Sequence, residues 1–155
     1  MQDCSDDRLY GAALAVYCRT TKRFLMLTEL EDKPKIFKKS GMLGFPTETK
    51  DTEDPTVRGT IKRLLREEIG VEEMEGDVYL RLAPATHFPH GVPVYIAWTI
   101  VEREFVTEPN DTDVQHAGWY SIDEIQSFVV QEDMARIETE TILSIAQKGL
   151  QGASV

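Results

Sequence analysis

The sequence has few cysteines and no long hydrophobic run. Cys4 and Cys18 are its only cysteines, too few for a disulfide framework, and neither stands at a zinc-ligand spacing. No apolar stretch approaches the roughly 18 residues that a membrane-spanning helix needs. The first eight residues carry three aspartates and no apolar stretch, unlike a signal peptide. We therefore expect a cytoplasmic protein with reduced thiols and no membrane contact.

Basic residues are also scarce. Lysine and arginine together number 17, against 27 aspartates and glutamates, which gives a net charge of −10. This balance repels a phosphate backbone, so binding to nucleic acid is not expected. A phosphorylated small molecule remains compatible with the composition if a divalent cation carries positive charge between the ligand and the protein.

The chain is long enough for one domain with its own core. It has 155 residues, of which 41% are hydrophobic and 28% charged, a composition that excludes a disordered chain. A domain of this size buries roughly 70% of its unfolded surface. We predict a single domain over residues 1–155, with residues 1–8 as a flexible tail and Cys18 as a buried thiol.

Hydrophobic periodicity predicts alternating strands and helices. Apolar residues occupy both faces of 10–18, which is typical of a strand covered on both sides. The predicted strands are at 10–18, 24–28, 77–83, 94–105 and 117–121, with weaker strand character over 35–45. The predicted helices are at 54–70, directly after 121 and at 131–148. These elements predict an α/β fold in which helices and a mixed sheet form a sandwich.

Capping signals define the ends of two of these helices. Asp54 is a favourable N-cap and Pro55 fits the first helical position. Gly70 supplies the stop of the same helix. Ser121 and Glu124 form a capping-box pattern that opens a short second helix. The first helix has one apolar face, so we expect it to pack against the sheet.

The end of the first helix carries the most informative motif. Its run is Arg63-Leu-Leu-Arg-Glu-Glu-Ile-Gly-Val71. This run resembles the Nudix box, which ends in R-E-U-x-E-E-x-G-U, where U is a bulky aliphatic residue. Two further segments are similar to the family pattern, Leu43-Gly-Phe-Pro46 and Gly118-Trp-Tyr-Ser-Ile-Asp-Glu-Ile125. The chain therefore resembles the Nudix hydrolase superfamily over most of its length, with a degenerate box.

The resemblance implies a fold, an activity and a set of site residues. The implied fold is an α/β/α sandwich with a mixed β-sheet. The implied activity is a pyrophosphohydrolase that cleaves a diphosphate bond in a nucleoside diphosphate linked to another moiety, with Mg²⁺ or Mn²⁺ as cofactor. Glu67 and Glu68 are then catalytic and hold the metal, and Arg63 orients them. A loop acid completes the metal site; Glu53 is the first choice, Glu48 the second, and Asp54 a further candidate.

Two departures from the family pattern bear on activity. Leu64 replaces a glutamate that would share one helical face with Glu67 and Glu68, and we interpret Leu64 as core packing. The pair Thr47-Glu48 replaces two glycines. Magnesium needs only one or two protein carboxylates, because water and substrate phosphates supply its other ligands. We therefore still expect one metal ion to bind.

Candidate substrate contacts lie in two loops and on one strand. A loop over 84–93 contains His87, Phe88 and His90. A histidine there is a candidate phosphate partner or general base, and Phe88 is a candidate stacking surface for a nucleobase. A solvated loop is the other interpretation, and zinc binding by the two histidines alone is not expected. The predicted substrate contacts are Phe45, Glu48, His87, Phe88 and Tyr95.

The sequence leaves three functions open. The first is a metal-dependent hydrolase that acts on a nucleotide-type small molecule. The second is a catalytically weak or inactive protein of the same fold that binds a nucleotide or a protein partner, which the missing glutamate at position 64 favours. The third, isomerase chemistry on an isoprenoid diphosphate, needs a catalytic cysteine, and neither cysteine is well placed. A homodimer formed through the last helix is also compatible with the sequence.

Overall fold

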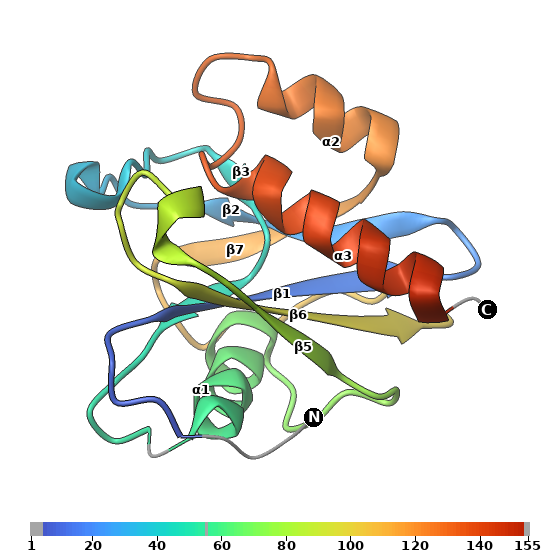
Figure 1. Cartoon of the computed structure of the whole chain (residues 1–155). Helices are drawn as coiled ribbons and strands as arrows, with labels where there is room; N and C mark the ends of the chain where they lie inside the picture. Colours follow the sequence, from blue (N-terminus) through green and yellow to red (C-terminus); the bar gives the residue numbers. More distant parts are fainter. Residues whose placement is uncertain (1–4, 55, 154–155) are drawn as a thin grey trace.

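A mixed β-sheet of seven strands forms the middle layer of the protein (Figure 1). The computed structural model describes residues 5–54 and 56–153. The main path through the sheet runs β3-β2-β1-β6-β5, with β4 paired to β1 and β7 paired to β2. The strands are β1 (Gly11–Cys18), β2 (Arg23–Glu29), β3 (Leu43–Gly44), β4 (Thr47–Thr49), β5 (Tyr79–Ala83), β6 (Val94–Val101) and β7 (Val114–Ser121).

Helices cover both faces of this sheet (Figure 1). The first helix, α1, covers one face and continues directly into a π-helical turn, η2. Helices α2 and α3 lie on the other face. The predicted α/β/α sandwich with a mixed sheet is confirmed. The helical segments are α1 (Val57–Leu64), η2 (Leu65–Ile69), α2 (Ile122–Val129), α3 (Thr139–Ala153) and two 3-10 turns, η1 (Pro34–Ile36) and η3 (Ala85–His87).

The central strands β1 and β6 divide the core into two parts. They pair in parallel from Gly11 opposite Val94 to the ends of both strands. Side chains of β1 are buried on both faces, as its apolar run predicted. Alternate residues of β6 enter opposite cores, so that Ile96 packs on the α3 side and Ala97 on the α1 side. Cys18 is a buried free thiol, as predicted.

One segment of the chain, residues 43–49, pairs with both β2 and β1. The C-terminal end of β1 pairs with β2 at Tyr17 and Cys18, whereas its first residues pair with β4. The segment over 43–49 pairs with β2 through β3 and then crosses to β1 as β4. This crossing places Thr47 and Glu48 at the edge of β1, beside the end of the first helix.

The last helix begins later than predicted. We predicted a helix over 131–148, but α3 starts at Thr139. The preceding residues pair with β3 instead: Leu43 N–H donates to Met134 O, and Arg136 N–H donates to Leu43 O, both at 2.8 Å. Tertiary pairing therefore overrides the helical periodicity of this segment.

Other predicted boundaries also shift. Helix α1 is capped by Thr56, whose hydroxyl accepts from Gly59 N–H at 3.1 Å, rather than by Asp54. The weak strand over 35–45 is reduced to the two residues of β3, because η1 occupies its start. The strand predicted at 94–105 ends at Val101. Cys4 and Pro55 lie outside the described residues.

Two predicted helix-end signals are confirmed, the glycine at the end of the first helix and the capping box before α2. Gly70 ends the first helical segment in a left-handed conformation. Ser121 and Glu124 form both hydrogen bonds of the capping box that opens α2. Within residues 5–54 and 56–153, none of the helices has the length and apolar character needed to cross a membrane.

Candidate active site

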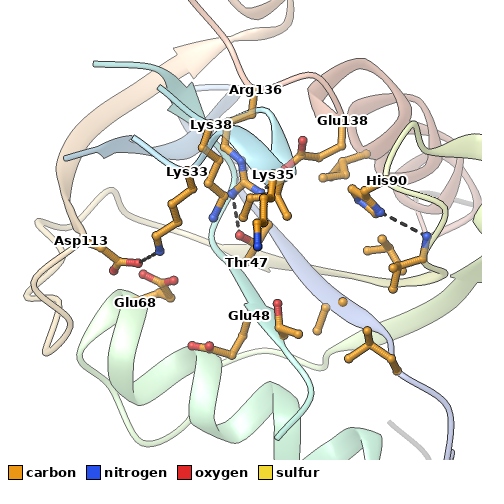
Figure 2. A pocket seen from close by; sticks show the side chains of 18 of the residues that line it. Lys33, Lys35, Lys38, Thr47, Glu48, Glu68, His90, Asp113, Arg136 and Glu138 are labelled. Carbon is orange, nitrogen blue, oxygen red and sulfur yellow. Dashed lines mark hydrogen bonds and ion pairs between the residues drawn. The ribbon is translucent and has the colours of Figure 1, made fainter. Parts of the chain in front are cut away.

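One pocket brings together Glu48 and Glu68, two of the acidic residues that the sequence singled out, and three lysines. It has a volume of about 310 Å³ and lies where β4 meets β1, beside the end of the first helix. Figure 2 shows Glu48 and Glu68 on its lower side, with Lys33, Lys35 and Lys38 across from them. The pocket therefore has an acidic side and a basic side.

The acidic side starts at the end of the first helix. After Leu64 the helix widens into the π-helical turn η2, and Gly70 ends it with a φ of 87°, a backbone conformation that favours glycine. Within this turn Glu68 is buried beside core residues, with an exposed fraction of 5%. Its Oε2 has no hydrogen-bond partner among the described residues. Because an unpaired buried carboxylate is costly, this atom marks a place for a ligand.

An acidic loop after β6, residues 108–113, is hydrogen-bonded to this helix end. Glu108 N–H donates to Ile69 O at 2.9 Å, and the N–H groups of Asn110 and Asp111 donate to Glu67 O at 2.8 and 3.1 Å. These bonds satisfy carbonyl groups that a helix end otherwise leaves unpaired. They also bring Asp111 next to Glu67, far away in the sequence.

Five carboxylates meet at this point. Glu48, Glu67 and Asp111 offer oxygens within 4.8 Å of one another, and Glu68, Asp111 and Asp113 form a second such set. Burial and then neighbouring carboxylates raise the pKa of Glu68 to about 9 and raise the pKa of Asp111 as well. A divalent cation would relieve this mutual repulsion. The all-oxygen donor set suits Mg²⁺ or Mn²⁺.

Arg63 connects the acidic side to the body of the helix. Its guanidinium lies 2.8 Å from Glu48 Oε1, 2.7 Å from Asp54 Oδ2 and 3.7 Å from Glu67 Oε2. Burial acts to lower the pKa of Arg63, but its carboxylate partners outweigh burial and raise that pKa. Burial likewise acts to raise the pKa of Asp54, and the hydrogen bond from Arg63 reverses this and lowers it. Asp54 is thus a charged anchor for Arg63.

Glu48 enters the pocket from β4 with its two oxygens in different environments. Oε1 pairs with Arg63, whereas Oε2 is buried and has no hydrogen-bond partner in the described part of the chain. Burial raises the pKa of Glu48; Arg63 opposes the rise and Glu67 adds to it. A carboxylate held at one oxygen and unpaired at the other is well placed to accept a proton or a ligand.

The basic side comes from two segments far apart in sequence. Lys33 Nζ lies 2.5 Å from Asp113 Oδ2, and this hydrogen bond raises the pKa of Lys33. Lys38 Nζ lies 3.5 Å from the buried carboxylate of Glu29, and burial lowers the pKa of Lys38. Arg136, from the segment before α3, reaches the same Glu29 at 3.1 Å.

The structure brings together four of the residues that the sequence singled out. Arg63, Glu67 and Glu68 meet at the helix end, and Glu48 joins them from β4. Glu53, the first choice for the loop acid, does not: it is exposed and belongs to neither carboxylate set. Leu64, at 0% exposure, packs in the core under α1, as interpreted from the sequence.

Three of the aromatic side chains predicted to contact substrate lie outside this pocket. Phe45 and Phe88 are buried in the core on the α3 side, at 2% and 4% exposure. Tyr95 is half-buried and donates its hydroxyl hydrogen to Asp6 at 2.7 Å. In this structure Phe45 and Phe88 pack in the core and Tyr95 contacts Asp6, so the substrate contacts predicted for these three side chains stay predictions.

The histidine that reaches the pocket is His90 rather than His87. His87 is exposed at the end of η3 and does not line the pocket. His90 lines it and stacks on Phe88, with ring centroids 5.4 Å apart and an interplanar angle of 3°. His90 Nδ1 accepts Val92 N–H at 3.2 Å, which leaves Nε2 as the donor of the neutral ring.

Sequence reasoning missed several residues of the site. Asp111 and Asp113 were visible only as part of an acidic loop, with no spacing that points to a ligand role. Lys33, Lys38 and Arg136 have no local pattern that marks them. Their position depends on hydrogen bonds between distant segments.

Comparison with known proteins supports the fold. No family model and no curated protein sequence matches the chain. The Nudix domain of NrtR from Shewanella oneidensis, solved with ADP ribose, is 12% identical, with a TM-score of 0.70 over 94% of this chain and 90% of that one. An Ap4A hydrolase from C. elegans is 13% identical, with a TM-score of 0.65 over 92% and 98%. A Nudix hydrolase from Nitrosomonas europaea is 16% identical, with a TM-score of 0.62 over 90% and 88%. These likenesses show that the chain has the Nudix fold.

Proposed function

We propose that this chain, which has the fold of Nudix hydrolases, is a divalent-metal-dependent hydrolase. Its substrate class is a nucleoside diphosphate linked to another moiety, and the bond it cleaves lies within the diphosphate. One observation carries the proposal: Glu68, whose buried Oε2 has no hydrogen-bond partner among the described residues, belongs to a group of five carboxylates, four of which line one pocket with three lysines. The solved neighbours include one bound to ADP ribose and one Ap4A hydrolase, which supports a nucleotide-linked substrate.

The carboxylates present fit a divalent cation. We assign Glu68, Asp111 and Asp113 as its ligands, and Glu67 as a further ligand beside Asp111. When bound, the cation neutralises the diphosphate and lowers the pKa of the attacking water. Arg63 holds the carboxylate of Glu67 in place from the preceding turn of the helix.

Glu48 is assigned as the general base. Arg63 holds its Oε1 at 2.8 Å, and its Oε2 is buried without a hydrogen-bond partner among the described residues, so Oε2 is available to take a proton. The water oxygen bonds to one phosphorus, and its proton passes to Glu48 Oε2. The bond from that phosphorus to the bridging oxygen breaks, and the second phosphate group departs with this oxygen.

The test is phosphate release, coupled to a phosphatase, over nucleoside triphosphates, ADP-ribose, dinucleoside polyphosphates, NADH and nucleotide sugars. Each substrate is measured with Mg²⁺, with Mn²⁺ and with EDTA. We expect metal-dependent turnover that falls by at least about 100-fold in Glu68→Gln and in Glu48→Gln, from loss of a ligand and of the base. Glu53→Gln is the matched control, since Glu53 is exposed outside the carboxylate sets.

Three outcomes would contradict the assignment. Turnover that persists in EDTA would exclude the metal. Turnover lost in Glu53→Gln but kept in Glu48→Gln would move the site to the loop acid first chosen from the sequence. No turnover of any substrate, together with metal-dependent nucleotide binding, would make the chain a binding protein rather than a hydrolase.

A further inference from the structure

The connection between β2 and β3 contains a small closed loop, which we call the lysine loop (Lys33–Lys38). Lys33 N–H donates to Lys38 O at 2.8 Å, and Lys38 N–H donates back to Lys33 O at 3.1 Å. Between them lies the 3-10 turn η1, and Phe37 turns the chain back with a φ of 60°. A bulky residue with left-handed backbone is strained and persists only where its surroundings fix it. The loop therefore has a defined shape.

The lysine loop presents three lysines to the pocket. Lys33 and Lys38 are opposite each other at its base, and Lys35 is on the turn between them. All three line the pocket, as Figure 2 shows. Lys35 is exposed and makes no ion pair with any of the residues described in the structure. In a chain with a net charge of −10, this is a local reversal of charge next to the carboxylates.

The other cations of the basic side are already balanced. Arg136 pairs with Glu29 and Glu138, and Lys38 shares Glu29. Gly44 makes room for this arrangement, because a Cβ at that position would overlap the Arg136 side chain. Arg136 is thus held in place on the basic side of the pocket. Lys35 is the cation of that side whose charge no carboxylate of the described residues compensates.

Lys33 shares a carboxylate with the acidic side. Its partner is Asp113 Oδ2, and Asp113 belongs to one of the two carboxylate sets. Asp113 Oδ1 is buried and has no hydrogen-bond partner among the described residues, so a cation can take Oδ1 while Lys33 stays on Oδ2. One negative charge then faces both the cation and Lys33, which leaves positive charge at the pocket for an anionic ligand.

We propose that the lysine loop binds substrate phosphate directly, through Lys35 and through Lys33, whose carboxylate partner Asp113 also holds the cation. The inference rests on the proposed function for the cation and deepens it by naming the residues that hold the second phosphate. One phosphate lies on the cation and the next lies on the lysines. The pocket therefore selects ligands with two or more linked phosphates over ligands with one.

The test is calorimetric binding of inorganic phosphate, pyrophosphate and tripolyphosphate to the full chain with saturating Mg²⁺. We expect Lys35→Ala to weaken pyrophosphate and tripolyphosphate by about tenfold, the loss of one hydrogen bond to a charged group. Inorganic phosphate, which occupies the cation alone, changes less than about twofold on the same reasoning. Lys35→Arg should restore most of the affinity. The matched control is Lys39→Ala, because Lys39 pairs with Asp133 and does not line this pocket.

The outcomes separate this inference from the proposed function. Unchanged pyrophosphate affinity in Lys35→Ala would overturn the lysine loop as a phosphate site, even in an active hydrolase. An equal loss for inorganic phosphate and pyrophosphate would overturn the selection for linked phosphates. A selective loss in a protein that hydrolyses nothing would support the lysine loop and contradict the hydrolase.

Discussion

At the scale of single residues, the site depends on how Glu68 is buried. The residue lies near the C-terminal end of a helix, where the helix dipole disfavours a negative charge. It is also surrounded by core residues and other carboxylates, which together raise its pKa to about 9. Near neutral pH the metal-free protein therefore holds Glu68 protonated, and the cation takes the place of that proton.

This protonation state makes a prediction for Glu68→Gln. Glutamine resembles protonated glutamic acid in shape, so the free energy of unfolding at pH 7 in EDTA should stay within about 1 kcal/mol of the unsubstituted protein. The rise in melting temperature on addition of Mg²⁺ or Mn²⁺ should disappear, because a ligand of the cation is lost. Thermal unfolding with and without each cation measures both effects. A preserved shift with Mn²⁺ would show that Glu68 is not a ligand.

At the scale of elements, the end of the first helix decides where the carboxylates point. The turn η2 closes with Gly70 N–H bonded to Leu65 O at 2.8 Å, five residues back. Gly70 lies against Glu108, and a Cβ at position 70 would overlap the Glu108 carbonyl. The same glycine thus ends the helix and lets the acidic loop approach it.

We predict that Gly70→Ala destabilises the protein and disturbs the site together. A left-handed backbone costs a non-glycine residue roughly 1–2 kcal/mol, and displacement of the acidic loop adds to this cost. Gly91→Ala is the matched control, because Gly91 also has a positive φ, 72°, but no atom within 4 Å of its Cβ position. Urea unfolding measures the difference. Equal losses in the two variants would show that the contact with Glu108 has no energetic weight.

The packing of the same helix explains why the Nudix-like motif has Leu64 where the family pattern has a glutamate. Leu64 has no exposed surface and packs in the core beneath α1. We predict that Leu64→Glu lowers the free energy of unfolding by about 3 kcal/mol or more, from lost burial and from a carboxylate without a partner. Leu64→Met is the control, with a loss below about 1.5 kcal/mol. The urea unfolding midpoints of both variants, compared with that of the unsubstituted protein, measure the loss. A stable Leu64→Glu protein with tighter Mg²⁺ binding would show that position 64 reaches the metal site.

At the scale of the whole molecule, clustered carboxylates set the pH dependence of stability. Glu68 has an ordinary pKa of 4.5 when unfolded and about 9 when folded, so the folded protein retains a proton that the unfolded chain releases. Stability then falls as the pH rises from about 5 to about 9, by up to about 1.4 kcal/mol per pH unit. The lowered pKa of Asp54 acts in the opposite direction at acid pH, where protonation of Asp54 removes its contribution.

We therefore predict that the metal-free protein is most stable near pH 5, about where these opposing contributions meet. Saturating Mg²⁺ should flatten the fall toward pH 9, because the cation favours the charged carboxylates. Urea unfolding from pH 4 to pH 9, in EDTA and in Mg²⁺, measures the profile. Without metal, Glu68→Gln should make the fall in stability shallower, while the raised pKa values of Glu48 and Asp111 keep part of it. A metal-free protein that gains stability between pH 6 and pH 9 would contradict the burial of an unpaired Glu68.

Local sequence patterns predict some secondary-structure elements of this protein better than others. The strand β6 was predicted from alternation alone, because each of its faces enters a different core. The segment before α3 has helical spacing, yet pairing with Leu43 holds it out of the helix. Local patterns predict an element well when no distant segment competes for its backbone hydrogen bonds.

The sequence by itself determined the sandwich, through the periodicity of its strands and helices, and the helix stop at Gly70. It also determined the meeting of Arg63, Glu67 and Glu68, because helical spacing puts these residues on one helix end. The tertiary structure decided the rest. Asp111 reaches Glu67 only through the hydrogen bonds that seal the helix. Glu48 faces Glu68 because one segment crosses from β2 to β1. Contacts of this kind join segments far apart in the chain, so no local pattern of residues records them.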